Sequence, residues 1–229
     1  MPSSNSRSPV GRGYDALAPR IKPLMTTGCL TLNSGPPGAG KTTVAESLAE
    51  RATKSVHLPS DSFWNLIRRG RIEPWLPQAD RQNGVVIDAL VAASMRFVLG
   101  GYAVFLDGVV GPWFIDRFRS AASETSQQLH YVVLRPADTV CLPRAVSRQP
   151  LDPLSEPLRD EGLIVELCRQ FRHLGPYEAN AVDTSSLTVG DAAAIIEEGL
   201  DLGRVQTQLA CARAKRTPTA EELALVDPL

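Results

Sequence analysis

Cysteine is scarce in this sequence of 229 residues, and its spacing excludes two kinds of protein. The four cysteines are Cys29, Cys141, Cys168 and Cys211. They form no C-x-x-C pair, so the sequence predicts neither a zinc site nor a disulfide framework. Free thiols are typical of a reducing compartment, and we therefore expect a cytoplasmic protein.

Net charge and long apolar runs are also lacking. Lys and Arg number 24 against 25 Asp and Glu, which leaves a formal net charge of -1 and no overall field that favours nucleic acid or an anionic membrane. No uninterrupted apolar run reaches the roughly 18 residues of a membrane-spanning helix, and the polar N-terminal region has no signal-peptide core. We expect a soluble protein with neither nucleic acid nor a membrane as partner, while a homo-oligomer stays open. The histidines are too scattered for a metal triad and are interpreted as structural: His57, His130 and His173.

What is present is an alternation of strand-like and helix-like segments. Short apolar strand candidates recur at 29–33, 55–58, 103–107, 129–134 and 181–184. Between them, residues 84–99 are nearly all apolar and predict a helix buried on several sides, and residues 158–174 keep a 3.6-residue apolar period. The sequence therefore predicts an α/β fold, a doubly wound parallel sheet of five strands with helices on both faces.

Composition also predicts the domain boundaries. Residues 1–24 combine Ser, Pro, Gly and Arg without any period, which predicts a flexible N-terminal arm. A chain of this length favours one core, and we expect a single domain over residues 25–212. Its last helix is expected over residues 189–212, and residues 213–229 are expected to form a frayed tail.

The stretch LTLNSGPPGAGKTTVAESLAE, residues 30–50, contains the most specific motif. It satisfies G-x-x-x-x-G-K-[ST] between a predicted strand and a predicted helix, which is the context the motif requires. Its glycines permit backbone angles that aim N–H groups inward, and the helix start adds a positive end. An ordinary strand-to-helix turn with an exposed lysine is the alternative. We expect a nucleoside triphosphate to bind to Gly35, Pro36, Pro37, Gly38, Ala39, Gly40, Lys41, Thr42 and Thr43.

Two side chains of this loop have expected roles in phosphate chemistry. Lys41 can reach the β and γ phosphates as a point charge, and the Thr42 hydroxyl can ligate the Mg²⁺ that bridges them. Downstream, the N-K-x-D motif of a regulatory GTPase is missing from the sequence. An AAA-type motor is expected to have a longer chain and a strand that ends in paired acidic residues, whereas the third strand ends in the single Asp107. Small-molecule kinases remain.

The stretches GPPGAGKTT, VHLPSDSFW and the span from FLDGVVGPWFIDRFR to YVVLRP resemble the P-loop small-molecule kinases, and within them the chloramphenicol phosphotransferase-like proteins. The resemblance covers approximately residues 28–200 and is strongest at the phosphate loop. It implies a doubly wound sheet, ATP with Mg²⁺, and transfer of the γ-phosphoryl group to a hydroxyl of a small molecule. The acceptor does not follow, because the architecture also resembles gluconate, shikimate and nucleoside kinases. An antibiotic and a metabolite both stay open.

Asp61, in PSDSFW, matches the aspartate just beyond the second strand that serves as the base in this group. Its position leads to the same interpretation, because an acid at the carboxyl end of a parallel strand faces the ligand crevice and can accept a hydroxyl proton. The alternative is that Asp61 caps the helix predicted after it, a role that Ser60 or Ser62 could fill equally well.

Aromatic and basic residues predict the acceptor pocket. Phe63, Trp64 and Arg68 would overhang the crevice and suit a flat or hydroxylated molecule, with a packed helix and a solvated basic face as the alternative. Trp113, beyond the third strand, is likewise expected either to contact the acceptor or to belong to a packed helix. Asp107 is expected to hold a water ligand of Mg²⁺ or to orient the acceptor hydroxyl, or else to cap the next helix.

Arg144 and Arg148 lie four residues apart after the fourth strand, so on a helix they share a face. The proline-rich stretch QPLDPLSEPLRD follows them. This combination predicts a catalytic lid that folds over the transferring phosphate, with a solvated helix face as the alternative.

Two other functions stay open. The domain could be a regulatory ATP-binding switch, which would need no general base at Asp61. It could also be a nucleotide kinase, whose acceptor phosphate Arg68, Arg69 and Arg81 could bind.

Overall fold

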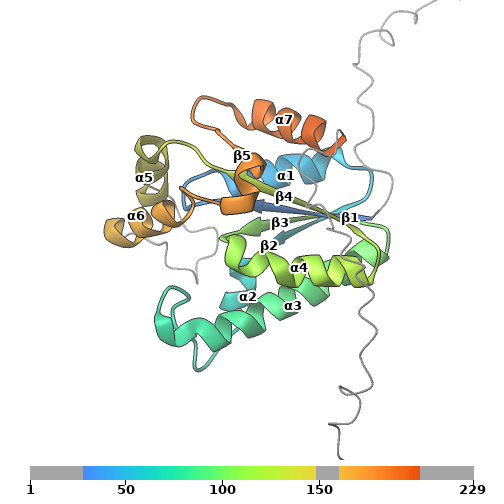
Figure 1. Ribbon diagram of the computed structural model, residues 1–229, viewed down its shortest axis with the longest axis horizontal. Helices are drawn as coiled ribbons and strands as arrows, with labels where there is room; N and C mark the ends of the chain where they lie inside the picture. Colours follow the sequence, from blue (N-terminus) through green and yellow to red (C-terminus); the bar gives the residue numbers. More distant parts are fainter. Residues whose placement is uncertain (1–27, 148–159, 202–229) are drawn as a thin grey trace, which may run out of the picture.

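The computed structural model describes residues 28–147 and 160–201 (Figure 1). The predicted N-terminal arm, the C-terminal tail, Arg148 and most of the proline-rich stretch lie outside these residues. In chain order the elements are β1 (Cys29–Ser34), α1 (Lys41–Arg51), β2 (Ser55–Pro59), α2 (Asp61–Asn65), the 3-10 helix η1 (Pro77–Ala79), α3 (Asp80–Leu99), β3 (Ala103–Gly108), α4 (Pro112–Glu124), β4 (Gln128–Leu134), α5 (Asp138–Val146), α6 (Glu161–Gln170), the 3-10 helix η2 (Gly175–Asn180), β5 (Ala181–Val182) and α7 (Val189–Asp201).

The five strands form one parallel sheet in the order β2-β3-β1-β4-β5. The chain leaves β1 toward β2 and β3 on one side and then continues with β4 and β5 on the other, so the strand order reverses at β1. Ligands of open α/β sheets bind outside the carboxyl ends of the strands at such a reversal. The predicted doubly wound sheet of five strands is confirmed.

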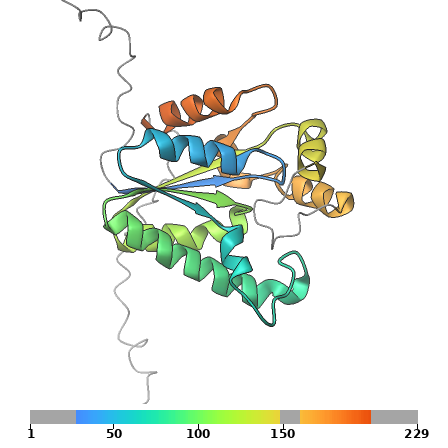
Figure 2. The same ribbon diagram turned by 180° about the vertical axis from the view of Figure 1, so that it is seen from behind.

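Helices cover both faces of the sheet. One face packs against α1 and α7 and buries Phe105, Leu134 and Ile196, whereas the other packs against α3 and α4 and buries Leu32 and Phe118. Figure 1 and Figure 2 show these two helical layers, with α5 and α6 beside the carboxyl ends of the strands. Two separate apolar layers therefore hold the strand ends, and the loops that follow them, in place.

Helix α3 differs from its sequence prediction. It begins at Asp80 and buries one face only: Ile87 and Leu90 are fully buried, whereas Val85 is 64% and Leu99 51% exposed. Burial on several sides was wrong, because its burial follows from the neighbours on one side, the sheet and α4. By length and composition residues 77–99 could cross a membrane, a weak test that the core helix of a soluble protein also passes.

The elements at the carboxyl end of the sheet are shorter than the sequence predicted. Helix α6 begins at Glu161 rather than residue 158, because the Asp160 carboxylate accepts a hydrogen bond from the Leu163 backbone N–H at 2.8 Å and caps the helix. The β5 ladder covers only Ala181 and Val182. Helices α5 and α6 pack against each other beside the loop that joins β1 to α1.

Candidate active site

The loop between β1 and α1 is packed tightly against α5. A Cβ at Gly38 would lie 2.2 Å from the Cys141 carbonyl oxygen, so only glycine fits there. Lys41 is 8% exposed, and its Nζ donates to the Pro36 carbonyl oxygen at 2.9 Å. The ammonium group therefore lies folded back over the loop, where its charge faces the loop backbone.

Helix α1 presents its amino end to the same loop. It begins at Lys41 after Gly40, with no side-chain cap and no acidic residue in its first turn. The first N–H groups of a helix have no acceptor within the helix, and its amino end bears partial positive charge. A cradle of this kind fits a phosphate group.

Asp107, at the end of β3, connects the loop to β2. Its side chain is almost buried, its Oδ2 accepts a hydrogen bond from Thr42 Oγ1 at 2.6 Å, and its Oδ1 lies 2.6 Å from His57 Nε2. The alternative that Asp107 caps the next helix is wrong, because Gly111 occupies the N-cap position of α4. The carboxylate belongs to the phosphate side of the site.

Thr42 and Asp107 offer oxygen atoms, which are the ligands that Mg²⁺ prefers. Magnesium sites commonly use one or two protein oxygens together with substrate phosphates. Over residues 28–147 and 160–201, no group of three or more His, Cys, Asp and Glu side chains could hold a metal by itself. The donor set therefore fits a Mg²⁺ that binds with a nucleotide.

Asp61 is the first residue of α2, and its side chain is exposed. Its carboxylate has no hydrogen-bond or ion-pair partner among the described residues. Ser60 occupies the N-cap position and no side chain caps α2, so the helix-cap alternative for Asp61 does not hold. The Ser60 N–H donates to the Asp107 carbonyl oxygen at 2.8 Å, which ties the start of α2 to the end of β3.

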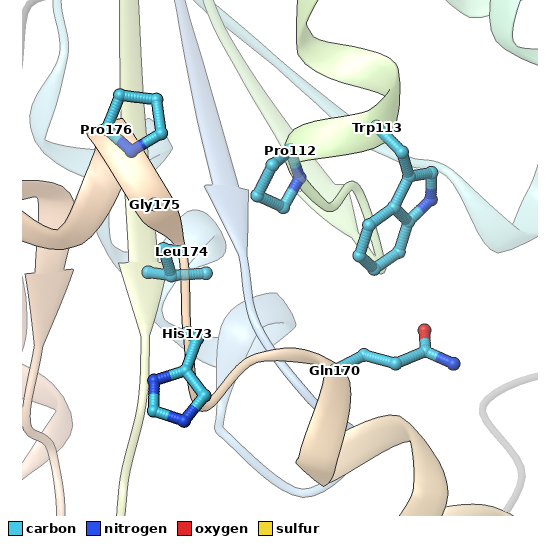
Figure 3. A pocket seen from close by; sticks show the side chains of 7 residues that line it. All are labelled: Pro112, Trp113, Gln170, His173, Leu174, Gly175 and Pro176. Atoms are coloured by element: carbon cyan, nitrogen blue, oxygen red, sulfur yellow. The ribbon is translucent and has the colours of Figure 1, made fainter.

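A cavity of about 450 Å³ opens beside the start of α4 (Figure 3). It is lined by Pro112, Trp113, Gln170, His173, Leu174, Gly175 and Pro176. The β3–α4 loop that carries its wall is fixed to the sheet, because the Val110 carbonyl oxygen accepts hydrogen bonds from Ser34 Oγ at 2.6 Å and from the Tyr131 hydroxyl at 2.8 Å. The cavity wall thus begins two residues beyond a direct contact with the end of β1.

Trp113 forms the aromatic wall of this cavity. It is 49% exposed, and its ring centroid lies 5.9 Å from that of the buried Phe171. A Cβ at Gly111 would lie 2.2 Å from the indole, so the absence of a side chain there makes room for the ring. In Figure 3 the Trp113 indole points from α4 toward the end of α6, where the Gln170 side chain lies. A half-exposed indole held in this way suits contact with the flat face of a ligand.

The structure does not bring the other predicted acceptor residues into this cavity. Phe63 lines a separate groove of about 550 Å³ between α2 and α3. Trp64 is only 9% exposed and its Nε1 donates to Asn83 Oδ1 at 2.9 Å, so the packed-helix alternative accounts for it. Arg68 is exposed in the segment after α2.

Of the two predicted lid arginines, the structure describes Arg144. Its side chain is exposed on α5, and Arg148 lies outside the described residues. The lid stays a prediction.

Sequence reasoning missed three residues of the site. His57 was interpreted as structural, although its place on β2 offered a signal. It lies two residues before Pro59, and side chains two residues apart on a strand share a face of the sheet. Because Pro59 is the register partner of Asp107, His57 and Asp107 lie on the same face. Gln170 and His173 come from α6 and the segment after it, and no local pattern marks them. Only the fold brings them opposite Trp113.

The fold and the loop define a P-loop nucleotide-binding domain, with a G-x-x-x-x-G-K-T loop at the point where the strand order of a parallel sheet reverses. Residues 30–156 match the family model described as AAA domain, and because this is more than half of the sequence, the chain belongs to that family. No curated protein matches the sequence.

Several solved structures are similar to this chain. The Deinococcus radiodurans tunicamycin resistance protein has a TM-score of 0.54 and 20% identity, over 78% of this chain and 98% of that one. A sugar kinase from Janibacter sp. HTCC2649 has a TM-score of 0.56 and 16% identity, over 77% and 96%. A gluconokinase from Sinorhizobium meliloti 1021 has a TM-score of 0.54 and 16% identity, over 78% and 99%. The chain has the fold of P-loop small-molecule kinases.

Proposed function

We propose that this protein is an ATP-dependent phosphotransferase that moves the γ-phosphoryl group to a hydroxyl of a small molecule. The observation that carries the proposal is that Asp107, at the end of β3, contacts both sides of the site. Its carboxylate accepts a hydrogen bond from Thr42 of the phosphate loop, and its carbonyl oxygen accepts one from the N–H of Ser60, the residue before the exposed Asp61. The kinases among the similar structures support it at the level of the fold.

In the proposed reaction the acceptor oxygen attacks the γ-phosphorus of ATP. A new phosphorus–oxygen bond forms, the bond to the β–γ bridging oxygen breaks, and ADP leaves with that oxygen. The acceptor hydroxyl proton passes to the Asp61 carboxylate. Lys41 places a fixed positive charge beside the phosphates, where negative charge shifts during transfer. A bound Mg²⁺, held by Thr42 and Asp107, would neutralise phosphate charge.

The cavity beside Trp113 is the proposed acceptor site. Among the described residues its lining contains no Lys, Arg, Asp or Glu. This composition favours an uncharged hydroxyl compound, an antibiotic or a metabolite, over an acceptor that carries a phosphate, because a buried phosphate needs cationic partners. Arg81, one of the arginines that a nucleotide kinase could use, lines the groove between α2 and α3 instead. The nucleotide-kinase alternative is therefore weakened.

A regulatory ATP-binding domain is the second candidate, favoured by the match to the AAA domain family. It would use the same loop for ATP and would need no base at Asp61. The two candidates differ in whether ATP consumption depends on an acceptor.

The test is a mass-shift screen with ATP and Mg²⁺ across hydroxyl-bearing antibiotics, sugars, nucleosides and hydroxy acids, with ADP release measured alongside. We expect acceptor-dependent ADP release and a product heavier by one phosphoryl group. In Asp61→Asn this transfer should fall roughly 10²- to 10⁴-fold without a change in melting temperature. Asp80→Asn, at another exposed first-turn acid, is the matched control.

Other outcomes of the screen would contradict the proposal in distinct ways. Slow ADP release that ignores every acceptor and survives Asp61→Asn would favour the regulatory domain. Phosphate transfer to nucleoside monophosphates alone would favour the nucleotide kinase, and Asp61 would then be assigned to binding a nucleoside hydroxyl.

A further inference from the structure

We infer that His57 is a positioning residue for phosphotransfer, which holds the Asp107 carboxylate in the orientation that accepts the Thr42 hydroxyl. The inference rests on the proposed function. It concerns a residue that the sequence motifs do not mark and that touches neither the phosphate loop nor the acceptor cavity in any contact described above.

The two oxygens of Asp107 are engaged by side chains from different elements. Thr42, on α1, donates to Oδ2 at 2.6 Å, and the Nε2 of His57, on β2, lies 2.6 Å from Oδ1. A carboxylate engaged at both oxygens cannot rotate about its Cβ–Cγ bond without losing a partner. His57 thereby sets the plane in which Asp107 meets Thr42.

Burial makes this contact matter. The side chain of Asp107 is 6% exposed and that of His57 is 17% exposed. Water can therefore replace the imidazole only poorly, and a buried carboxylate oxygen without a partner is costly. Without His57, Asp107 would gain by turning toward another donor, and its alignment with Thr42 would be lost.

The backbone fixes where the imidazole stands. In the β2–β3 register His57 lies opposite Phe105, and Pro59 lies opposite Asp107. The side chains of a strand return to the same face of the sheet every two residues. The His57 side chain is therefore on the same face as the Asp107 carboxylate, two residues earlier along the paired strands. Strand β2 itself does not need a histidine, because β-branched and apolar residues fit a strand better. The contact with Asp107, rather than strand propensity, is therefore the role that we infer for the histidine at this position.

The chemistry of the contact predicts which substitution should restore the function that His57→Ala loses. An ionised carboxylate only accepts hydrogen bonds, so Nε2 must bear the proton that it donates. The side-chain amide nitrogen of glutamine has a reach comparable with that of Nε2, whereas that of asparagine is one bond shorter. His57→Gln should restore what His57→Ala loses, and His57→Asn should not.

The first experiment compares these three variants in turnover and in binding. His57→Ala should lower kcat by about 10- to 100-fold, the usual cost of losing a partner that orients a ligand side chain, while acceptor KM changes little. In a thermal-shift titration, the Mg²⁺ concentration needed for half of the ATP-induced stabilisation should rise about tenfold. Ser55→Ala is the control, because Ser55 lies on β2 and its hydroxyl contacts the Ala49 carbonyl oxygen instead.

The second experiment is a double-mutant cycle with Asp107→Asn. If His57 acts through Asp107, the double variant His57→Ala, Asp107→Asn should be no slower than Asp107→Asn alone. Multiplied losses would overturn the inference, as would a His57→Ala variant that keeps its kcat and Mg²⁺ requirement and loses only melting temperature. Those results would leave the phosphotransferase proposal intact. If no acceptor is ever phosphorylated, the proposed function fails, and the Mg²⁺ titration with ATP alone still decides the role of His57.

Discussion

The proposed phosphate side and the proposed acceptor side of this site are built in opposite ways. On the phosphate side Lys41 and Asp107 are nearly buried, and each is hydrogen-bonded within the protein. On the acceptor side Asp61 is exposed and Trp113 is 49% exposed. Groups that are already hydrogen-bonded to one another are in place before a ligand binds. Little reorganisation then remains during the reaction, and this stabilises the transition state. Exposed groups instead gain their contacts from the ligand itself.

From this difference we expect some substitutions to slow the transfer step and others to change which acceptor is chosen. Substitutions on the phosphate side should lower transfer to every acceptor by a similar factor. Apart from Asp61, the proposed base, substitutions on the acceptor side should change KM and the choice of acceptor while ATP binding stays constant. Three predictions test this division and one tests the sheet beneath the phosphate side; the four follow in order of expected size.

Of these four, removing the cation of the phosphate side should have the largest effect. We expect Lys41→Ala to lower kcat by about 10²- to 10³-fold for all acceptors, because the phosphates lose a preorganised charge. Lys54→Ala is the control, since Lys54 is exposed and contacts the Gly100 carbonyl oxygen and the Tyr102 ring. Wild-type protein should be stabilised by about 2.7 kcal/mol when ATP is at about 100 times its Kd. A wild-type melting temperature that ATP with Mg²⁺ does not move would contradict the phosphate-loop interpretation.

The sheet beneath the phosphate side should carry a pH dependence of stability. His130, on β4 opposite Thr31 of β1, is 2% exposed, and burial lowers its pKa from 6.5 to about 4. The folded state therefore favours neutral imidazole, and protonation comes with unfolding. Stability is full above pH 6.5 and should fall by about 3 kcal/mol as the pH drops to about 4.

Urea unfolding at a series of pH values measures this loss, and His130→Leu, which cannot titrate, is the comparison. The variant should lose less stability over the same interval. Equal losses in the two proteins would assign the acid sensitivity to carboxylates instead.

On the acceptor side, Trp113→Ala should raise acceptor KM by about tenfold, which corresponds to about 1.4 kcal/mol of lost aromatic contact, while ATP affinity stays unchanged. Gly111→Ala should have a similar effect, because the new Cβ displaces the indole without removing it. Trp75→Ala is the matched control, since Trp75 is 43% exposed and lies outside the cavity lining. A KM that is constant in both variants would move the acceptor site away from this cavity.

The smallest effect is expected at the predicted lid. Replacing Arg144 and Arg148 together by alanine should lower kcat a few-fold and leave ATP affinity within about threefold, because contacts to the moving phosphoryl group strengthen in the transition state. The effect is small because the Arg144 side chain is exposed to solvent. Arg96→Ala, at an exposed arginine of α3, is the control. Unchanged turnover in the double variant would assign both arginines to a solvated face.

The phosphate loop could be predicted from the sequence because its information is contiguous. The G-x-x-x-x-G-K-T motif occupies one turn between a strand and a helix, so local backbone geometry alone specifies what it can bind. The order of apolar segments was likewise sufficient for the doubly wound sheet, since parallel strands need helical crossovers between them. The place of Asp61 after β2 could be predicted as well, because it follows from the same alternation of strands and helices.

The residues of the acceptor side could not be predicted in the same way, because they come from elements that only the fold brings together. Phe63 and Trp64 are neighbours of Asp61 in sequence, yet Phe63 lines another groove and Trp64 is buried against α3. A short helix turns successive side chains by about 100° each, so closeness in sequence does not specify a shared cavity.

By itself, the sequence determined the phosphate loop, the parallel α/β architecture and the acid that follows β2, because each depends on the chemistry of one short segment. Only the tertiary structure decided that His57 meets Asp107 and that Gln170 and His173 stand opposite Trp113. These contacts depend on strand register and on the position of Phe171, just after α6, against Trp113 of α4. Such long-range geometry results from burial over the whole core, which no local pattern of residues encodes.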